Sequence, residues 1–259
     1  MKRILILTLS IPLIITSCIP LFTCIRGNGN MITEIRDPAA FDFLINSTAI
    51  DVVFAEADTF GIILEIEENL AGYIQTDVSG NRLEIKNSRG VNCINFTRTP
   101  LIRVSAPLLT GLVLSGSGNL DADLIEAENA VVKLTGSGNL VLESIVAISA
   151  DITLSGSGDL SVRTIECNEA DVKITGSGDF SAGGSADNGM FMLTGSGDSY
   201  TRNLITERAT ATLTGSGNLH IWVTMQLNAI LSGSGNIYLG GQPQVYANIS
   251  GSGRIIEFK

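Results

Sequence analysis

Seven Asn and Asp residues that follow a repeated Gly-Ser-Gly phrase are the residues whose types and spacing best suit chemistry. They are Asn119, Asn139, Asp159, Asp179, Asp198, Asn218 and Asn236. If each repeat forms one coil of a stack, neighbours in this column lie roughly 4.8 Å apart, and adjacent aspartates repel one another unless a cation bridges them. Ca²⁺ prefers carboxylate and carbonyl oxygens. One hypothesis is therefore a weak calcium site at Asp159, Asp179 and Asp198; the alternative is that these are solvated turn residues.

The asparagines of the same column predict a structural role. Stacked asparagines form ladders in which each amide bonds the next, and Asn also suits tight corners. We expect Asn119, Asn139, Asn218 and Asn236 to form such a corner ladder. No cofactor other than the calcium ion is expected.

Other arrangements that could do chemistry have simpler explanations. The single histidine, His220, occupies an outward position after a triplet and is expected to be a solvated side chain. Asp151 and Asp171 lie near Lys133 and Lys173 of adjacent repeats, which predicts a surface charge ladder. Carbohydrate cleavage needs converging carboxylates in a groove, and the sequence shows no long loop to form one.

These residues are positioned by a repeat array. An aliphatic residue, Ser or Thr, and Gly-Ser-Gly recur eight times, and the first glycines are Gly116, Gly136, Gly156, Gly176, Gly195, Gly215, Gly233 and Gly251. A period near 20 residues without helical spacing is typical of a β-solenoid, in which each repeat is one coil stacked on its neighbours.

The apolar residues alternate as in half-buried strands. Two residues before each first glycine stand Leu114, Leu134, Leu154, Ile174, Leu193, Leu213, Leu231 and Ile249. After each triplet a second strand begins, with Leu120 as its first inward residue, and a third inward point recurs at Ile125, Ile145, Ile165 and Leu204. Each coil therefore contains two clear strands and a weaker third.

The repeated glycines need a structural reason, because glycine in regular structure costs about 0.5–1 kcal/mol relative to alanine. Two reasons are open: a corner residue with positive φ, or close approach of stacked backbones.

Residues 1–23 resemble a secretory signal. Lys2-Arg3 precede an apolar run of about a dozen residues, which is too short to span a bilayer. Ile15-Thr16-Ser17-Cys18 resembles the lipobox of bacterial lipoproteins, which implies lipidation of Cys18 and anchoring to a membrane. The alternative is an ordinary signal peptide cut elsewhere.

The remaining chain is expected to be one domain. Residues 24–110 have weaker periodicity and are interpreted as irregular first coils that cap the stack, while residues 111–259 form the regular array. An atypical last coil, with Arg254 in place of Asn or Asp, is expected to cap the other end. Cys24, Cys93 and Cys167 are too few and scattered to predict a disulfide framework or metal cluster, and their pairing stays open.

Composition excludes two classes of function. The formal net charge is −10 and no basic aromatic stripe occurs, which argues against nucleic-acid binding. No helix follows the glycine triplets, which argues against a phosphate-binding loop.

The segment Arg26-Gly27-Asn28-Gly29-Asn30, Arg36-Asp37 followed by Phe41, and the repeated Gly-Ser-Gly-Asn/Asp resemble the putative auto-transporter adhesin, head GIN domain family. The resemblance implies an all-β fold, a right-handed single-stranded parallel β-helix, and an exported protein without catalytic residues. One departure is the segment 46–51, Asn46 to Asp51, which replaces an early Ser-Gly-Ser-Gly-Asp, so the first turn must bend differently.

We therefore expect a non-enzymatic, adhesin-like lipoprotein of the outer membrane, surface-exposed or facing the periplasm. Its partner would be a glycan or another envelope or host surface component, and the outward aromatics Tyr200, Tyr238, Tyr246 and Trp222 are candidate stacking residues. A periplasmic structural or partner-binding scaffold is the alternative. A polysaccharide-active enzyme is a third hypothesis, since parallel β-helices carry such enzymes but fold alone does not imply function.

Overall fold

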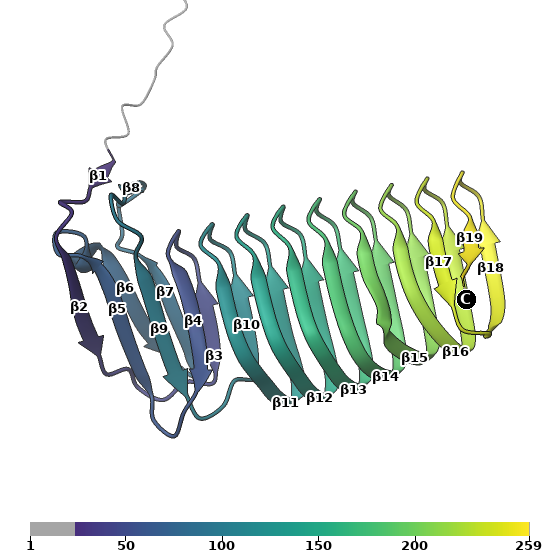
Figure 1. Cartoon of the computed structure of the whole chain (residues 1–259), viewed down its shortest axis with the longest axis horizontal. Helices are drawn as coiled ribbons and strands as arrows, with labels where there is room; N and C mark the ends of the chain where they lie inside the picture. The colour runs from purple at the N-terminus through teal and green to yellow at the C-terminus, as the bar shows by residue number, and fades with distance from the viewer. Residues whose placement is uncertain (1–23, 259) are drawn as a thin grey trace, which may run out of the picture.

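The computed structural model describes residues 24–258 as one elongated stack of β-coils (Figure 1). The predicted signal and Cys18 lie outside the described residues. Within residues 24–258, no helix is long and apolar enough to cross a membrane. The N-terminal strands and the C-terminal strands lie at opposite ends of the stack (Figure 1).

The regular array consists of parallel strands in register. Its strands are β10 (Gly111–Leu114), β11 (Leu120–Leu134), β12 (Leu140–Leu154), β13 (Leu160–Ile174), β14 (Phe180–Leu193), β15 (Ser199–Leu213), β16 (Leu219–Leu231), β17 (Ile237–Gly240), β18 (Gln244–Ile249) and β19 (Ile255–Glu257). Each long strand pairs with the next so that equivalent residues of successive repeats face one another, as Leu134 faces Leu154. The predicted parallel β-helix with one repeat per coil is confirmed.

The predicted inward columns form the core. Leu114 to Leu231 of the column before the triplet are buried, as are Ile125, Ile145, Ile165 and Leu204. The exception is Ile249 in β18, which is exposed; within residues 24–258, β18 pairs with β16 alone. The capping role expected of the last coil stays a prediction.

The N-terminal part is less regular than the expected coils. Its elements are β1 (Ile25–Arg26), β2 (Met31–Arg36), β3 (Phe43–Asn46), β4 (Asp51–Glu56), β5 (Gly61–Glu67), η1 (Ala71–Tyr73), β6 (Ile74–Ser79), β7 (Arg82–Asn87), β8 (Ile94–Asn95) and β9 (Leu101–Ala106). Strands β3, β4, β7 and β9 stack in parallel, but β2–β5, β5–β9 and β6–β7 are antiparallel. The β6–β7 pair follows from the tight turn at Gly80, whose positive φ of 62° joins the two strands as a hairpin.

This N-terminal part closes its end of the core. Leu70, Ala71 and Ile74 are buried at the short helix η1, and they cover the apolar interior. The capping role expected of the N-terminal segment is thus visible in the packing.

Two contacts that the sequence did not predict secure the first residues. Cys24 forms a disulfide with Cys93, and β1 pairs with β8 beside it. The buried carboxylate of Glu67 accepts hydrogen bonds from the backbone N–H of Gly29 at 2.6 Å and of Thr97 at 2.9 Å.

Cys167 is a free thiol, and burial raises its pKa to about 11.

The triplet glycines are required by close approach of stacked backbones. A Cβ on Gly136 would lie 1.9 Å from the carbonyl oxygen of Gly116, and one on Gly138 would lie 2.0 Å from that of Gly118. The glycines with positive φ lie elsewhere, at Gly29, Gly80, Gly90, Gly184 and Gly241. Of the two reasons considered, close approach is correct and positive φ is wrong.

Candidate functional site

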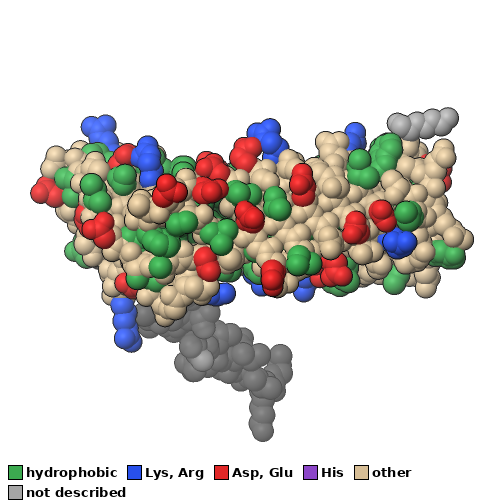
Figure 2. Space-filling model, turned by 90° about the horizontal axis from the view of Figure 1, so that it is seen from below, with side chains coloured by type: hydrophobic (Ala, Val, Ile, Leu, Met, Phe, Trp, Pro, Cys, Tyr) green, Lys and Arg blue, Asp and Glu red, His purple; other side chains and the backbone are tan. Residues whose placement is uncertain are grey.

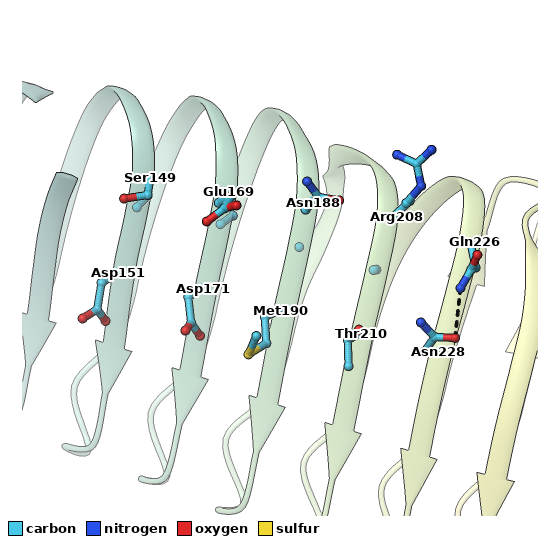
Figure 3. Close-up of a pocket in the computed structure, with 14 residues that line it drawn as sticks. Ser149, Asp151, Glu169, Asp171, Asn188, Met190, Arg208, Thr210, Gln226 and Asn228 are labelled. Carbon is cyan, nitrogen blue, oxygen red and sulfur yellow. Dashed lines mark hydrogen bonds between the residues drawn. The ribbon is translucent and has the colours of Figure 1, made fainter. Parts of the chain in front are cut away.

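A trough of about 580 Å³ crosses five consecutive strands, β12 to β16, on the outside of the array (Figure 3). Its two walls are rows of side chains that run along the stack. One wall consists of Ser149, Glu169, Asn188, Arg208 and Gln226, and the other of Asp151, Asp171, Met190, Thr210 and Asn228. The trough is therefore elongated along the solenoid axis.

Strand alternation places both walls and the floor. Residues i and i+2 of a strand point to the same face, and the residue between them points inward. In β12 to β15 the intervening residues are small, namely Ala150, Ala170, Gly189 and Ala209, so the backbone forms the floor between two rows of longer side chains. The repeat carries this arrangement from coil to coil, which makes a trough without a long loop. The lack of a long loop, noted from the sequence, therefore does not prevent a trough from forming.

One half of the trough is acidic. Asp151, Glu169 and Asp171 lie on adjacent strands (Figure 3). Partial burial and the charge of Asp151 raise the pKa of Asp171 above its ordinary value, although Lys173 acts in the opposite direction. Lys133 lies 4.0 Å from Asp151, so one ion pair of the predicted charge ladder is present at this wall.

The other half offers hydrogen-bond donors. Asn188 and Arg208 extend from one wall, and the side chain of Gln226 donates to that of Asn228 at 3.1 Å across the trough (Figure 3). This bond bridges the two walls at β16. Met190, which is exposed, offers an apolar surface midway along the trough.

The residues first singled out from the sequence form a continuous ladder at the corner, away from the trough. Each side-chain Oδ1 accepts a hydrogen bond from the backbone N–H of the equivalent residue in the next coil. The donor–acceptor distances are 3.0 Å for Asn139–Asn119, 2.9 Å for Asp159–Asn139, 2.9 Å for Asp179–Asp159, 2.8 Å for Asp198–Asp179, 2.7 Å for Asn218–Asp198 and 3.0 Å for Asn236–Asn218. Each side chain therefore bonds the backbone of the next coil, whereas we expected it to bond the next side chain. Side-chain amide contacts are additional, at Asn218 and Asn236.

The ladder has one more rung at its N-terminal end than the sequence indicated. Asp51 accepts from the backbone N–H of Asn119 at 2.7 Å, so the atypical turn supplies the first rung. Inside that turn buried Asn46 donates to the carbonyl of Ile50 and accepts from Thr48. The turn therefore supports the first triplet without glycines of its own, and Gly116 and Gly118 pack against the carbonyl oxygens of Thr48 and Ile50.

The geometry at Asp159, Asp179 and Asp198 does not add support for calcium. Each uses one oxygen or its backbone N–H in the ladder. Within residues 24–258, no group of three or more His, Cys, Asp or Glu side chains is arranged to hold a metal ion. The calcium site stays a prediction, and a melting temperature that calcium or a chelator leaves unchanged would remove it.

The outward aromatics are only partly gathered. The rings of Tyr200, His220 and Tyr238 stack on adjacent coils, with centroids 5.1 Å and 4.4 Å apart, so His220 is a member of a ring stack rather than a freely solvated side chain. Tyr246 is exposed in the last coil. Trp222 is half-buried and packs edge-on against Phe258 at 6.1 Å, so it does not present a free face as expected.

Charge elsewhere on the surface is dispersed. Figure 2 shows acidic side chains spread along the length of one face, with basic and apolar side chains between them. This distribution agrees with the formal net charge of −10 and offers no basic stripe on the face shown.

Solved structures resemble this fold over nearly the whole chain. A crystal structure of a putative adhesin from Parabacteroides merdae matches with a TM-score of 0.85 and 21% identity, covering 91% of this chain and 99% of that one. A putative lipid binding protein from Parabacteroides distasonis matches with a TM-score of 0.84 and 26% identity, covering 92% and 100%. A comparison with curated proteins finds no match.

A family model provides the assignment. The model of the putative auto-transporter adhesin, head GIN domain matches residues 40–160 and 144–243, which together span most of the chain. The stacked coils, the corner ladder and this match agree, and the chain belongs to the putative auto-transporter adhesin, head GIN domain family.

Proposed function

We propose that the protein is an exported, lipid-anchored envelope protein that binds an extended glycan, without cleaving it, along the trough of β12 to β16. The observation that carries the proposal is the trough itself, which presents polar side chains at regular intervals on five successive coils. The coil spacing of roughly 4.8 Å is comparable to the length of one sugar unit in an extended chain. Successive sugars would therefore meet successive pairs of wall residues.

The side chains of the trough favour a glycan over other polymers. Carboxylates at Asp151, Glu169 and Asp171 accept hydrogen bonds from hydroxyl groups, and Asn188 and Arg208 donate them. An extended peptide gains affinity chiefly by adding a strand to a free sheet edge. Strands β13 to β15 are paired on both sides, so they offer no such edge to a peptide.

Three lines support export and anchoring. The family is described by an adhesin name, Cys18 ends a lipobox-like segment, and the Cys24–Cys93 disulfide suits an oxidising compartment. One relative is described as a putative lipid binding protein. In this chain the polar walls of the trough favour a glycan as ligand.

A glycan array probed with the exported protein tests the binding proposal. We expect a restricted set of linear glycans to bind, and Asp171→Asn and Arg208→Ala to weaken that binding. Asp123→Asn is the matched control, because Asp123 is exposed outside the trough. Equal binding by all variants would contradict the trough as the site, and release of shorter sugars from a bound glycan would identify an enzyme instead.

Protease accessibility on intact cells tests the location. We expect the protease to digest the wild-type protein on whole cells. We also expect the Cys18→Ala variant to be released from the membrane. Protection until lysis would place the protein in the periplasm and favour the scaffold function.

A further inference from the structure

A second groove lies on the outside of the stack, between the loop that joins β9 to β10 and strand β12. Its volume is about 760 Å³, and it is lined by Pro107 and Leu108 of the loop, residues 126–128 of β11 and residues 146–148 of β12. None of these residues lines the trough. The loop lies on the lower side of the stack in Figure 1, which is the side that Figure 2 shows.

A backbone hydrogen bond fixes the loop that forms one wall of the groove. The N–H of Glu126 in β11 donates to the carbonyl of Leu109 at 3.1 Å. The side chain of Leu109 is buried, whereas that of Leu108 is 42% exposed. The wall is therefore held against β11 and presents an apolar side chain to the groove.

The apolar surface continues on β12. Val146 is 41% and Ile148 is 57% exposed, and Ala147 between them is half-buried against the core. Alternate residues of a strand point to the same side, so the two large aliphatic side chains stand together on the outside. Covering them would remove apolar area from water, which favours binding.

Carboxylates flank this apolar strip on both sides. Glu126 of β11 and Glu166 of β13 pair in register with Val146 from opposite sides, and Glu128 is the next outward residue of β11. Within residues 24–258, none of the three glutamates forms an ion pair, and no Lys or Arg lines the groove. Figure 2 shows acidic and apolar side chains next to one another on this side of the stack.

This combination favours a partner that is both apolar and cationic. The glutamates would repel a nucleic acid or an anionic lipid, and a polyamine has no side chain to cover Val146 and Ile148. Strands β11 and β13 occupy both edges of β12, so a peptide cannot bind there by adding a strand. An amphipathic helix binds through its side chains, and a basic one carries both properties.

The dimensions of the groove match an α-helix lying along β12. Two residues of a strand span about 6.8 Å and four residues of a helix about 6.0 Å, so apolar helix residues at i and i+4 would contact Val146 and Ile148. Strands β11 and β13 lie two strand spacings apart, about 9.6 Å, and a helix with its side chains is about 10–12 Å wide. Basic residues on its two flanks would therefore reach Glu126 and Glu128 on one side and Glu166 on the other.

We propose that this groove binds a basic amphipathic α-helix of a peptide or partner protein. The apolar stripe of the helix covers Leu108, Val146 and Ile148, and its flanking lysines or arginines pair with the glutamates. Burial of the aliphatic side chains supplies the affinity, and the charges supply the orientation and the rate of encounter. The proposal is independent of glycan binding, because the groove and the trough share no lining residue.

Fluorescence anisotropy with a labelled helical peptide of leucine and lysine, in which the leucines form one stripe, tests the proposal. The protein is the exported form carrying Cys18→Ala, so that no lipid competes for the peptide. We expect saturable binding that weakens as the salt concentration is raised. A peptide of the same composition in scrambled order, without the stripe, should bind at least about tenfold more weakly.

Two matched pairs of variants locate the site. Val146→Asn should weaken binding at least about tenfold, whereas Val141→Asn should not, because Val141 is 40% exposed on the same strand but lies outside the groove. Glu128→Gln should weaken binding about two- to fivefold, whereas Asp123→Asn, which removes the same charge from β11 outside the groove, should leave it unchanged. The trough variant Asp171→Asn should bind the peptide like the wild type.

Three results would overturn the proposal. The first is the absence of binding to the striped peptide. The second is equal binding of the scrambled peptide, which would show that general attraction to a negatively charged protein holds the peptide. The third is an equal effect of the two variants in either matched pair, which would place the peptide elsewhere on the surface.

Discussion

The substitution Gly156→Ala tests whether the triplet glycines are required by the stacking of the coils. A Cβ at residue 156 would lie 1.9 Å from the carbonyl oxygen of Gly136, and Cβ atoms essentially never approach another atom closer than 3.0 Å. The two coils must therefore separate locally by more than an ångström. This displacement breaks the hydrogen bond from the backbone N–H of Ser157 to Gly136, now 3.2 Å long.

The expected loss combines two effects. Overpacking a tight site costs about 1–3 kcal/mol, and a lost backbone hydrogen bond costs about 0.5–1.5 kcal/mol. The free energy of unfolding should therefore fall by roughly 1.5–4.5 kcal/mol. For a chain of this size, each kcal/mol lowers the melting temperature by about 2–4 °C, so we expect a decrease of roughly 3–18 °C.

Thermal unfolding followed by circular dichroism measures this decrease, with Gly72→Ala as the matched control. Gly72 lies in η1, its φ is not positive, and nothing lies within 4 Å of a Cβ placed there. Alanine should be neutral at this position or stabilise the protein by about 0.4–1 kcal/mol. If Gly156→Ala unfolds at the same temperature as Gly72→Ala, close backbone approach is not the reason for the repeated glycines.

Three further predictions concern other contacts. Asn139→Ala removes the side-chain oxygen that accepts a hydrogen bond from the backbone N–H of Asp159. The free energy of unfolding should fall by about 0.5–1.5 kcal/mol, measured as a lower denaturation midpoint. An unchanged midpoint would show that this hydrogen bond does not stabilise the fold. Burial raises the pKa of Glu67, but hydrogen bonds from Thr97 and Gly29 outweigh it and hold the pKa below its ordinary value of 4.5. The stability from Glu67 should therefore be present above that value and be lost as the pH falls through the lowered pKa, so Glu67→Gln should flatten the acid limb of a stability–pH curve; an unchanged limb would contradict this origin. The Cys24–Cys93 disulfide closes a loop with a sequence separation of 69. Its reduction should lower the free energy of unfolding by at most about 4.4 kcal/mol on the loop-entropy model and increase proteolysis near residue 24. Equal protease resistance of the oxidised and reduced forms would show that the disulfide does not secure this segment.

The repeat made the array predictable. Identical phrases spaced near 20 residues, with aliphatic residues at Leu134 and Leu154, allow one consistent stacking, because a shift by one residue would turn every apolar side chain outward. The same reasoning located the corner column of Asn and Asp. It did not predict which atoms bond, because a carboxamide or carboxylate can reach either the next side chain or the next backbone N–H.

The trough could have been suspected from the column of small residues at Ala150, Ala170 and Ala209, but their positions show only that they point inward. Whether the two flanking rows converge into a trough or spread apart depends on how the strand bends at that point, and strand alternation does not encode the bend. The disulfide partner of Cys24 and the hydrogen-bond partners of Glu67 could not be predicted either. They lie 69 and about 30–40 residues away along a stretch without periodicity.

By itself, the sequence determined the coil, its period, its inward columns and its corner, because each is repeated and local. Only the tertiary structure decided the antiparallel pairing in the N-terminal part and the trough across β12 to β16. These features depend on which surfaces meet after the coils have stacked.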